Sequence, residues 1–208
     1  SYNTVLNAEN KPLFNRAFQG AYPPGSTFKP VVGLAALNEN VITADTTIYC
    51  KHVYTRYQDY QPKCLGWHQN VNLRRALAVS CNYYFFEVGY RLGIEKVDEY
   101  AKQFGLGQKT GIELSESAGT LAGPESRLKM ANNVWNPGDT LQASIGQSDH
   151  AFTPLQLAMY TATIANDGTR YRARLVKTVV SKDHSEVLVE DKPEVLGKVN
   201  ASLHAFED

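Results

Sequence analysis

The sequence lacks an apolar run long enough to cross a bilayer, which takes roughly 18–20 residues. Its longest apolar stretch covers residues 30–37, is interrupted by Gly33 and is followed by Asn38. No signal peptide opens the chain. If the parent protein is anchored in a membrane, we therefore expect its anchor to lie outside this chain.

The sequence also lacks an excess of charge of either sign, since it has 21 basic and 21 acidic residues among its 208. This balance gives no electrostatic reason to expect nucleic acid or an anionic membrane surface as the main partner. Hydrophobic residues make up 43% and charged residues 20%, a composition that supports a buried core and argues against disorder. Internal repeats and low-complexity tracts are absent, so we expect one continuous domain.

Local patterns predict a mixed helix and strand chain. The dense break Tyr22-Pro23-Pro24-Gly25 precedes a helix that should start near Ser26, because Pro30 is tolerated only in a first helical turn. The other expected elements are a strand and loop over residues 1–20, a long loop with a short hairpin over 43–70, helices from Asn72 (broken at 80–82) to 92, over 95–104 and over 154–166, irregular chain over 111–150, two antiparallel strands over 170–181 and 186–190, and a helical start near Asn200.

Ser26 and Lys29 lie three residues apart at the start of the predicted first helix. This spacing places both side chains on one helical face, about one turn apart, so the lysine amine can approach the serine hydroxyl. A serine hydroxyl is a weak nucleophile until a base accepts its proton, and a desolvated lysine amine can be that base. The helix N-terminus adds free N–H groups and a positive partial charge near an attacked carbonyl. Taken alone, the spacing also fits a capping serine beside a solvated lysine.

The surrounding segment separates these two interpretations. Residues 15–30 read NRAFQGAYPPGSTFKP. This stretch closely resembles the segment around the nucleophile of penicillin-binding proteins, whose superfamily combines Ser-x-x-Lys, Ser-x-Asn and Lys-Thr-Gly motifs. A second motif, Ser80-Cys81-Asn82, follows 54 residues after Ser26, at the break between two predicted helices. The resemblance covers residues 11–180, and its string near the nucleophile is similar to the monofunctional class B type.

The third motif is where the sequence departs from the family pattern. Lys109-Thr110-Gly111 has the right letters, but it follows a predicted helix and opens a loop. The family's third motif should lie on a strand whose backbone binds substrate by strand addition. We therefore interpret this triplet as structural and expect the true motif beyond Asp208. Under the resemblance, residues 1–208 form a partial transpeptidase domain that lacks full catalytic power on its own and has an incomplete oxyanion hole.

The resemblance implies an α/β fold of the β-lactamase and transpeptidase type, an antiparallel sheet flanked by helices that is incomplete in this chain. It also implies an acyl transfer in which Ser26 attacks the carbonyl between the terminal D-alanines of a peptidoglycan stem peptide. Lys29 would act as the base, Ser80 would pass a proton to the leaving amine, and Asn82 would hold the substrate and the lysine. The implied partners are stem peptides, β-lactam antibiotics and other cell-wall synthesis proteins, at the extracytoplasmic face of the bacterial membrane.

Two other functions share the first motif. A bifunctional class A enzyme would carry the same half with a glycosyltransferase domain upstream. A β-lactam sensor or scaffold domain would be acylated without turning over D-Ala-D-Ala substrate. A β-lactamase is disfavoured because no deacylation base is evident after the first motif. A triad that uses Asp149-His150 is set aside because nothing in the sequence connects this pair to Ser26.

Three cysteines and a histidine lie close together in the sequence, at Cys50, Cys64, His68 and Cys81. Three thiolates and one imidazole suit a tetrahedral structural zinc ion, which would tie the loop insertion over residues 43–70 to the helix that follows Cys81. The resemblance adds that some class B proteins bind zinc through the middle residue of the Ser-x-Asn motif, which is Cys81 here. His52 is a rival fourth ligand. A Cys50–Cys64 disulfide with Cys81 as a buried thiol, or three unpaired thiols, stay open as alternatives.

Overall fold

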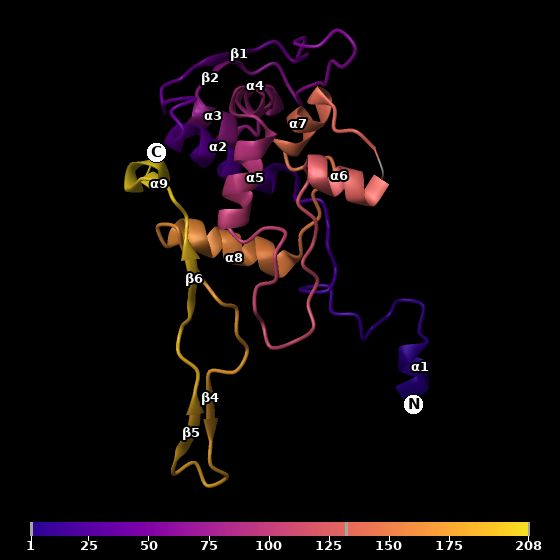
Figure 1. Ribbon diagram of the computed structural model, residues 1–208, viewed down its shortest axis with the longest axis vertical. Coiled ribbons are helices and arrows are strands. Elements are labelled where there is room, and N and C mark those ends of the chain that lie inside the picture. The colour runs from indigo at the N-terminus through magenta and orange to yellow at the C-terminus, as the bar shows by residue number, and fades with distance from the viewer. Residues whose placement is uncertain (1, 132, 208) are drawn as a thin grey trace.

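The computed structural model describes residues 2–131 and 133–207, and it packs helices around a core from which a long β-ribbon extends (Figure 1). The helices are α1 (Tyr2–Leu6), α2 (Lys29–Asn38), α3 (Leu73–Ala78), α4 (Asn82–Leu92), α5 (Ile94–Gln103), α6 (Pro124–Ala131), α7 (Pro137–Ala143), α8 (Pro154–Ala165) and α9 (Leu203–Glu207), with a 3-10 turn η1 (Gly25–Phe28) directly before α2. The strands are β1 (Ile48–Cys50), β2 (Gln69–Val71), β3 (Thr169–Tyr171), β4 (Thr178–Val180), β5 (Val187–Glu190) and β6 (Val195–Lys198). Within the described residues, none of the helices has the length and apolar character that crossing a bilayer demands.

Helix α2 lies at the centre of the core and contacts α3, α4, α5 and α9. It is apolar on all sides, and Val31, Val32, Leu34, Ala35 and Ala36 are buried, as expected of a helix surrounded by others. Pro30 occupies its first turn, where a missing N–H costs no helical hydrogen bond. The prediction of a helix that starts near Ser26 is therefore confirmed.

The aromatic residues that follow the second motif form much of the core around α4. Tyr84, Phe85 and Phe86 are almost completely buried, so they pack in the core. Trp67 is different, because 72% of its surface is exposed. Gly93, at a φ of +81°, joins α4 to α5 through a backbone conformation that few other residues adopt.

The strands form three separate antiparallel pairs, β1 with β2, β3 with β6, and β4 with β5. The mixed helix and strand class is confirmed, but the described residues form short ribbons instead of one sheet flanked by helices. The predicted strand pair over 170–181 and 186–190 is correct only for β4 and β5. Arg170 lies in β3, which pairs with β6 because the chain returns to the body after the hairpin.

Two predictions of local structure are wrong. Residues 2–6 form the helix α1 instead of a strand, and none of them is buried. Five residues without core contact carry too short a pattern to distinguish the helical period of 3.6 residues from the strand period of two. The segment 111–150 contains α6 and α7, whose starts are hidden in a Pro-rich and Asn-rich stretch. Each begins at a proline, and in α7 Asp139 accepts a hydrogen bond from the backbone N–H of Asn136.

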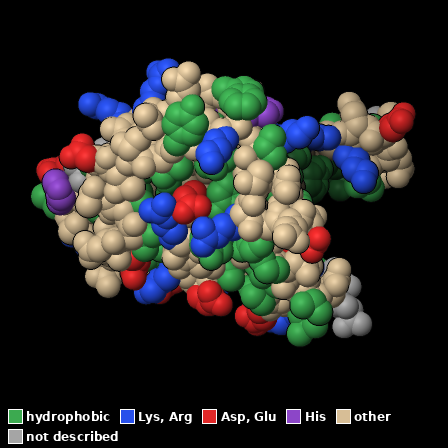
Figure 2. All heavy atoms as spheres, turned by 90° about the horizontal axis from the view of Figure 1, so that it is seen from above, with side chains coloured by type: hydrophobic (Ala, Val, Ile, Leu, Met, Phe, Trp, Pro, Cys, Tyr) green, Lys and Arg blue, Asp and Glu red, His purple; other side chains and the backbone are tan. Residues whose placement is uncertain are grey.

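Charged side chains of both signs are interspersed on the face seen from above in Figure 2. This arrangement agrees with the net charge of zero. The face therefore shows no extended field of one sign that would attract a polyanion.

Candidate active site

The first motif lies where η1 passes into α2. Ser26 is the second residue of η1, and Lys29 is the first residue of α2. The turn before Ser26 is held by a hydrogen bond of 2.8 Å from the backbone N–H of Gly25 to the carbonyl of Gly146. Lys29 is only 1% exposed, so its amine is removed from bulk water.

The second motif forms the connection between α3 and α4. Ser80 has a φ of +52°, a left-handed conformation that is uncommon for a residue other than glycine. Asn82 is the first residue of α4, and Cys81 between them is extended. Backbone strain of this kind clusters at functional sites, where the surrounding structure maintains it.

The structure brings the four predicted catalytic residues into one hydrogen-bonded chain. The Lys29 Nζ donates to Ser80 Oγ at 2.9 Å, to the Ser80 carbonyl at 2.9 Å and to Asn82 Oδ1 at 2.7 Å. Ser80 Oγ donates in turn to Ser26 Oγ at 2.8 Å. The amine therefore reaches the Ser26 hydroxyl through Ser80, a relay that the spacing of Ser26 and Lys29 did not predict.

Burial of Lys29 lowers its pKa from 10.5 to about 8, because the charged ammonium is poorly solvated there. Cys64 and Cys81 act in the opposite direction, since negative charge on nearby thiolates favours the charged amine. The loss of solvation dominates. A lysine with this pKa has about a tenth of its amine neutral at pH 7 and about half at pH 8, and the neutral form is the one that a proton acceptor requires.

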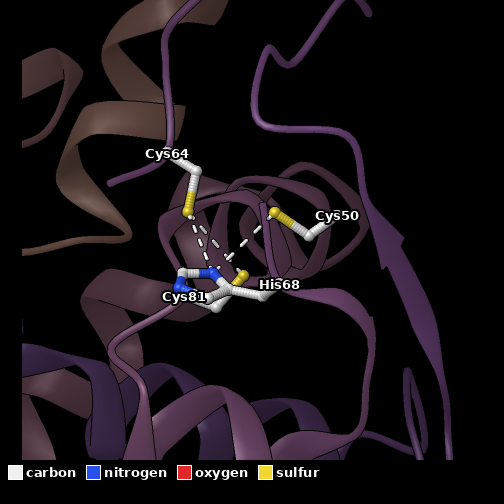
Figure 3. Close-up of side chains that lie close together, drawn as sticks. All are labelled: Cys50, Cys64, His68 and Cys81. Atoms are coloured by element: carbon white, nitrogen blue, oxygen red, sulfur yellow. Dashed lines mark hydrogen bonds between the residues drawn. The ribbon is translucent and has the colours of Figure 1, made fainter. Parts of the chain in front are cut away.

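Cys50, Cys64, His68 and Cys81 converge on one point behind the second motif (Figure 3). All four potential ligand atoms lie within 4.8 Å of one another. The sulfur atoms of Cys64 and Cys81 are 3.8 Å apart, and His68 Nδ1 lies 3.5 Å from Cys64 Sγ and 3.9 Å from Cys50 Sγ. Residues from a strand, a loop and a helix junction thus form one compact set of soft donors.

The three thiols are free, so the alternative Cys50–Cys64 disulfide is not formed. The thiols of Cys64 and Cys81 share a hydrogen bond, which lowers the pKa of Cys64 and raises that of Cys81. The rival ligand His52 lies outside the cluster and stacks on Trp67 instead, with ring centroids 5.6 Å apart.

The Lys109-Thr110-Gly111 triplet has a structural setting. It follows α5 in a loop, and the backbone N–H groups of Thr110 and Gly111 donate to the carboxylate of Glu116 at 3.0 and 2.8 Å. The Thr110 hydroxyl donates to the same carboxylate at 2.8 Å. These contacts agree with the interpretation that the triplet stabilises a loop.

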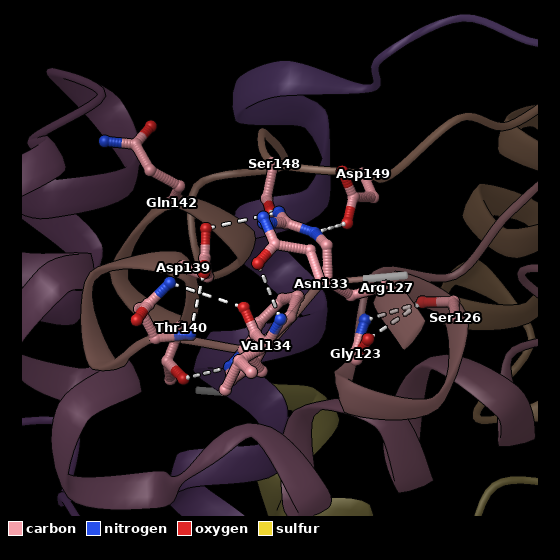
Figure 4. Close-up of polar contacts among 12 residues, drawn as sticks. Gly123, Ser126, Arg127, Asn133, Val134, Asp139, Thr140, Gln142, Ser148 and Asp149 are labelled. Carbon is pink, nitrogen blue, oxygen red and sulfur yellow. Dashed lines mark hydrogen bonds and ion pairs between the residues drawn. The ribbon is translucent and has the colours of Figure 1, made fainter. Parts of the chain in front are cut away.

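Asp149 and His150 also have structural settings. Asp149 is paired with Arg127, which also contacts Asp139 and Ser148 and so links α6, α7 and the following loop (Figure 4). The His150 Nδ1 accepts a hydrogen bond from the backbone N–H of Ala122 at 3.0 Å. Burial lowers the pKa of His150 to about 3, which leaves it a poor base at neutral pH.

Two further residues that sequence reasoning missed support the turn around Ser26. The Tyr160 hydroxyl donates to the carbonyl of Thr27 at 2.5 Å. Gly146 packs directly against Gly25, since a Cβ added to Gly146 would lie 1.9 Å from the Gly25 carbonyl oxygen.

The penicillin binding protein transpeptidase domain is the family whose sequence model matches residues 1–208. A curated relative, the peptidoglycan D,D-transpeptidase MrdA of Acinetobacter baumannii, is 38% identical over 173 residues, which cover 81% of this chain and 26% of the relative. The chain thus spans about a quarter of the length of this relative.

Two solved structures are similar to the chain over most of its length. Penicillin-binding protein A from Mycobacterium tuberculosis, as a ceftriaxone acyl-enzyme complex, matches with a TM-score of 0.84 and 28% identity, and the match covers 99% of this chain and 45% of that one. The complex between penicillin-binding protein PBP2 and MreC from Helicobacter pylori matches with a TM-score of 0.78 and 31% identity, and the match covers 89% of this chain and 34% of that one.

Proposed function

The chain belongs to the penicillin-binding protein transpeptidase family, and we propose that it carries the nucleophile of a peptidoglycan D,D-transpeptidase. The observation that carries the proposal is the hydrogen-bonded chain from Lys29 through Ser80 to Ser26. The name of the curated relative and the acyl-enzyme form of the mycobacterial structure support it. Since the chain spans only part of these proteins, the activity of the whole enzyme is part of the proposal.

The geometry favours a proton relay through Ser80. As Ser26 Oγ attacks the carbonyl between the terminal D-alanines of a stem peptide, its proton passes to Ser80 Oγ while the Ser80 proton passes to neutral Lys29. When the C–N bond breaks, the proton returns through Ser80 to the amine of the departing D-alanine. The amine of a second stem then attacks the ester carbonyl, which forms the cross-link and restores the Ser26 hydroxyl.

Ser80 and Asn82 have separate duties in this proposal. Ser80 lies between the base and the nucleophile, and its left-handed backbone directs its hydroxyl toward both. Asn82 Oδ1 accepts from Lys29 at 2.7 Å and so holds the amine at the relay. The backbone N–H of Ser26 would contribute one donor to the oxyanion hole.

Intact mass spectrometry after incubation with penicillin tests this function. We expect a single acyl adduct that maps to Ser26, and no adduct on a Ser26→Ala variant. A Ser115→Ala variant is the matched control because this serine lies in an exposed loop, and it should be labelled like the wild type. A covalent label that survives in Ser26→Ala would show that the nucleophile is assigned wrongly.

We further propose that Cys50, Cys64, His68 and Cys81 hold a structural zinc ion. Tetrahedral zinc with Zn–S bonds of about 2.3 Å and Zn–N bonds of about 2.0–2.1 Å sets its ligand atoms about 3.5–3.8 Å apart. The separations of 3.5 and 3.8 Å in the cluster fall within this range, and the separation of 3.9 Å lies just above it. Four side-chain ligands leave no open coordination position, so the ion would stabilise the loop insertion and take no part in the acyl transfer.

Native mass spectrometry and elemental analysis test the zinc site. One zinc per chain is expected for the wild type and for a His52→Ala variant, since His52 lies outside the cluster. A Cys50→Ser variant should lose the ion. Zinc-free wild-type protein, or retention of zinc by Cys50→Ser, would contradict the assignment.

We also propose an extracytoplasmic location and partners among cell-wall synthesis proteins. The relative is named as a peptidoglycan enzyme, and peptidoglycan is assembled outside the cytoplasmic membrane. The solved complex of PBP2 with MreC supports a protein partner for a member of this family. Co-purification of the parent protein with membrane-associated cell-wall proteins is the expected result.

A further inference from the structure

A cavity of about 460 Å³ lies between the loop insertion and the start of α7. Its walls include Tyr57, Asp59 and Tyr60 from the loop and Asn136, Gly138 and Gln142 from the region of α7. The volume falls within the range of about 300–1,000 Å³ that small-molecule sites occupy. None of the residues proposed for acyl transfer or zinc binding lines it.

The shape of the cavity is fixed by specific contacts between its two walls. The ring of Tyr60 lies against Gly138, where an added Cβ would come within 2.7 Å of the ring. Gln142 Nε2 donates to the Tyr60 hydroxyl. Tyr57 packs edge-on to Tyr90 of α4, with ring centroids 6.1 Å apart, which holds the loop wall against the core.

The polar groups of the cavity are mostly acceptors. Gln142 points away from the Arg127 network (Figure 4), and since its Nε2 donates to Tyr60, its carbonyl oxygen is left to accept. The exposed carboxylate of Asp59 has no hydrogen bond or ion pair within the described residues. A ligand that fits would combine several hydroxyl or amide donors with apolar C–H faces that pack on aromatic rings, and a sugar ring has both.

The cavity is connected to the turn of the nucleophile from two sides. Gln142 lies four residues before Gly146, whose carbonyl accepts the hydrogen bond from the backbone N–H of Gly25, next to Ser26. Tyr90, which contacts Tyr57, is eight residues beyond Asn82 on α4, or about 12 Å along the helix axis. Four extended peptide residues span about 13–14 Å. A stem peptide is therefore comparable in length to the stretch of α4 between the second motif and the tyrosine that packs on the cavity wall.

We propose that this cavity binds an N-acetylhexosamine ring of the glycan strand, so that the domain holds the sugar as well as the peptide of its substrate. The proposal rests on the transpeptidase function proposed above. It assigns Tyr60 as the aromatic platform, and Asp59 and Gln142 as acceptors for the sugar hydroxyl and acetamido donors.

Titration of the protein with a disaccharide of two linked N-acetylhexosamine rings, followed by NMR, tests the proposal. We expect shifts of Tyr57, Tyr60 and Gln142 resonances, and binding weakened about tenfold by Tyr60→Ala, which corresponds to about 1.4 kcal/mol. Asp59→Asn should weaken binding as well, and it disturbs no contact of the fold. Tyr49→Ala is the matched control, because Tyr49 is an exposed tyrosine on the neighbouring strand β1 and does not line the cavity.

Two outcomes would overturn the assignment: a wild-type protein whose cavity resonances do not respond to the disaccharide, or equal binding by wild type, Tyr60→Ala and Asp59→Asn. If an unglycosylated stem peptide shifts these resonances and the disaccharide does not, the acceptors bind the peptide amine and the sugar assignment is excluded. Penicillin labelling separates this test from that of the proposed function. It should be unchanged in Asp59→Asn and Tyr60→Ala, whereas failure to label the wild type would refute the transpeptidase proposal and leave the sugar titration to be judged on its own result.

Discussion

Replacement of Gly146 by alanine should misplace the nucleophile without touching it. Gly146 adopts a φ of +75°, and a Cβ at this position would lie 1.9 Å from the carbonyl oxygen and 2.7 Å from the carbonyl carbon of Gly25. Real Cβ atoms approach backbone no closer than 3.0 Å, so the two segments must separate by about 1.1 Å. Because Ser26 follows Gly25 directly, this displacement is passed to the nucleophile.

The size of the effect follows from two terms. Left-handed backbone costs an alanine about 1–2 kcal/mol, and overpacking in a tight contact costs about 1–3 kcal/mol more. We expect a loss of about 2–5 kcal/mol in the free energy of unfolding, or roughly 4–20 °C in Tm for a chain of this size. A misplacement of about 1 Å at a reacting group costs on the order of 10²-fold in rate, so the acylation rate constant should fall by about that factor.

Stopped-flow acylation with a fluorescent penicillin measures the rate, and thermal unfolding measures the stability. Gly93→Ala is the matched control, since Gly93 has a φ of +81° but a Cβ there would meet its nearest neighbour at an ordinary 3.4 Å. It should lose stability through backbone strain alone and should acylate like the wild type. Folded Gly146→Ala protein that acylates at the wild-type rate would refute the idea that the Gly146 contact positions Ser26.

Three further predictions concern titration and ion pairs. Because the pKa of Lys29 is lowered to about 8, the acylation rate constant should rise with pH up to about 8 and level off above it. A rate constant that does not change from pH 6 to 9 would exclude Lys29 as the proton acceptor. Burial raises the pKa of Asp98 from 3.8 to about 7, and its Oδ1 has no partner among the described residues. The contribution of this carboxyl to the stability of the folded state is therefore complete below pH 3.8, where it is protonated, and is lost as pH rises through 7. Asp98→Asn should therefore be more stable than the wild type in urea unfolding at pH 8, with a smaller difference at pH 5, and a variant less stable at both values would count against this reasoning. Arg127→Gln should lower the free energy of unfolding by about 2–4 kcal/mol, because it leaves Asp139 and Asp149 without their ion pair. Lys129→Gln removes an exposed pair with Glu125 and should lower it by less than about 1 kcal/mol. Similar losses in the two variants would contradict the assigned role of the Arg127 network.

The parts of the fold that the sequence predicted well have strong local signals. The helix α3 has Asn72 as its cap, and its side chain accepts from the backbone N–H of Arg75. Helices α4 and α5 are separated by Gly93, and α8 starts at a capping box of Thr153 and Gln156. In these places the termination and capping chemistry is contained within a few residues, so no tertiary information is needed.

The parts that were missed depend on contacts between distant segments. The partner of β3 is β6, reached only after the β4–β5 hairpin, and no local pattern in Arg170 or Tyr171 specifies that return. The contact of Gly146 with Gly25 joins segments more than a hundred residues apart. The relay role of Ser80 likewise depends on a left-handed backbone that its sequence neighbours do not require.

The turn that carries the second motif connects the acyl-transfer residues to the cysteine cluster. Ser80 and Asn82 face Lys29, whereas the completely buried Cys81 between them contacts Cys64. Ser80 keeps its uncommon backbone conformation only if the residues on both sides are held. The cluster behind the turn supplies one of these restraints and the Lys29 amine supplies the other. The loop over residues 43–70 therefore contributes to the proposed active site through the backbone of a single residue, although none of its side chains forms part of the hydrogen-bonded chain from Lys29 to Ser26.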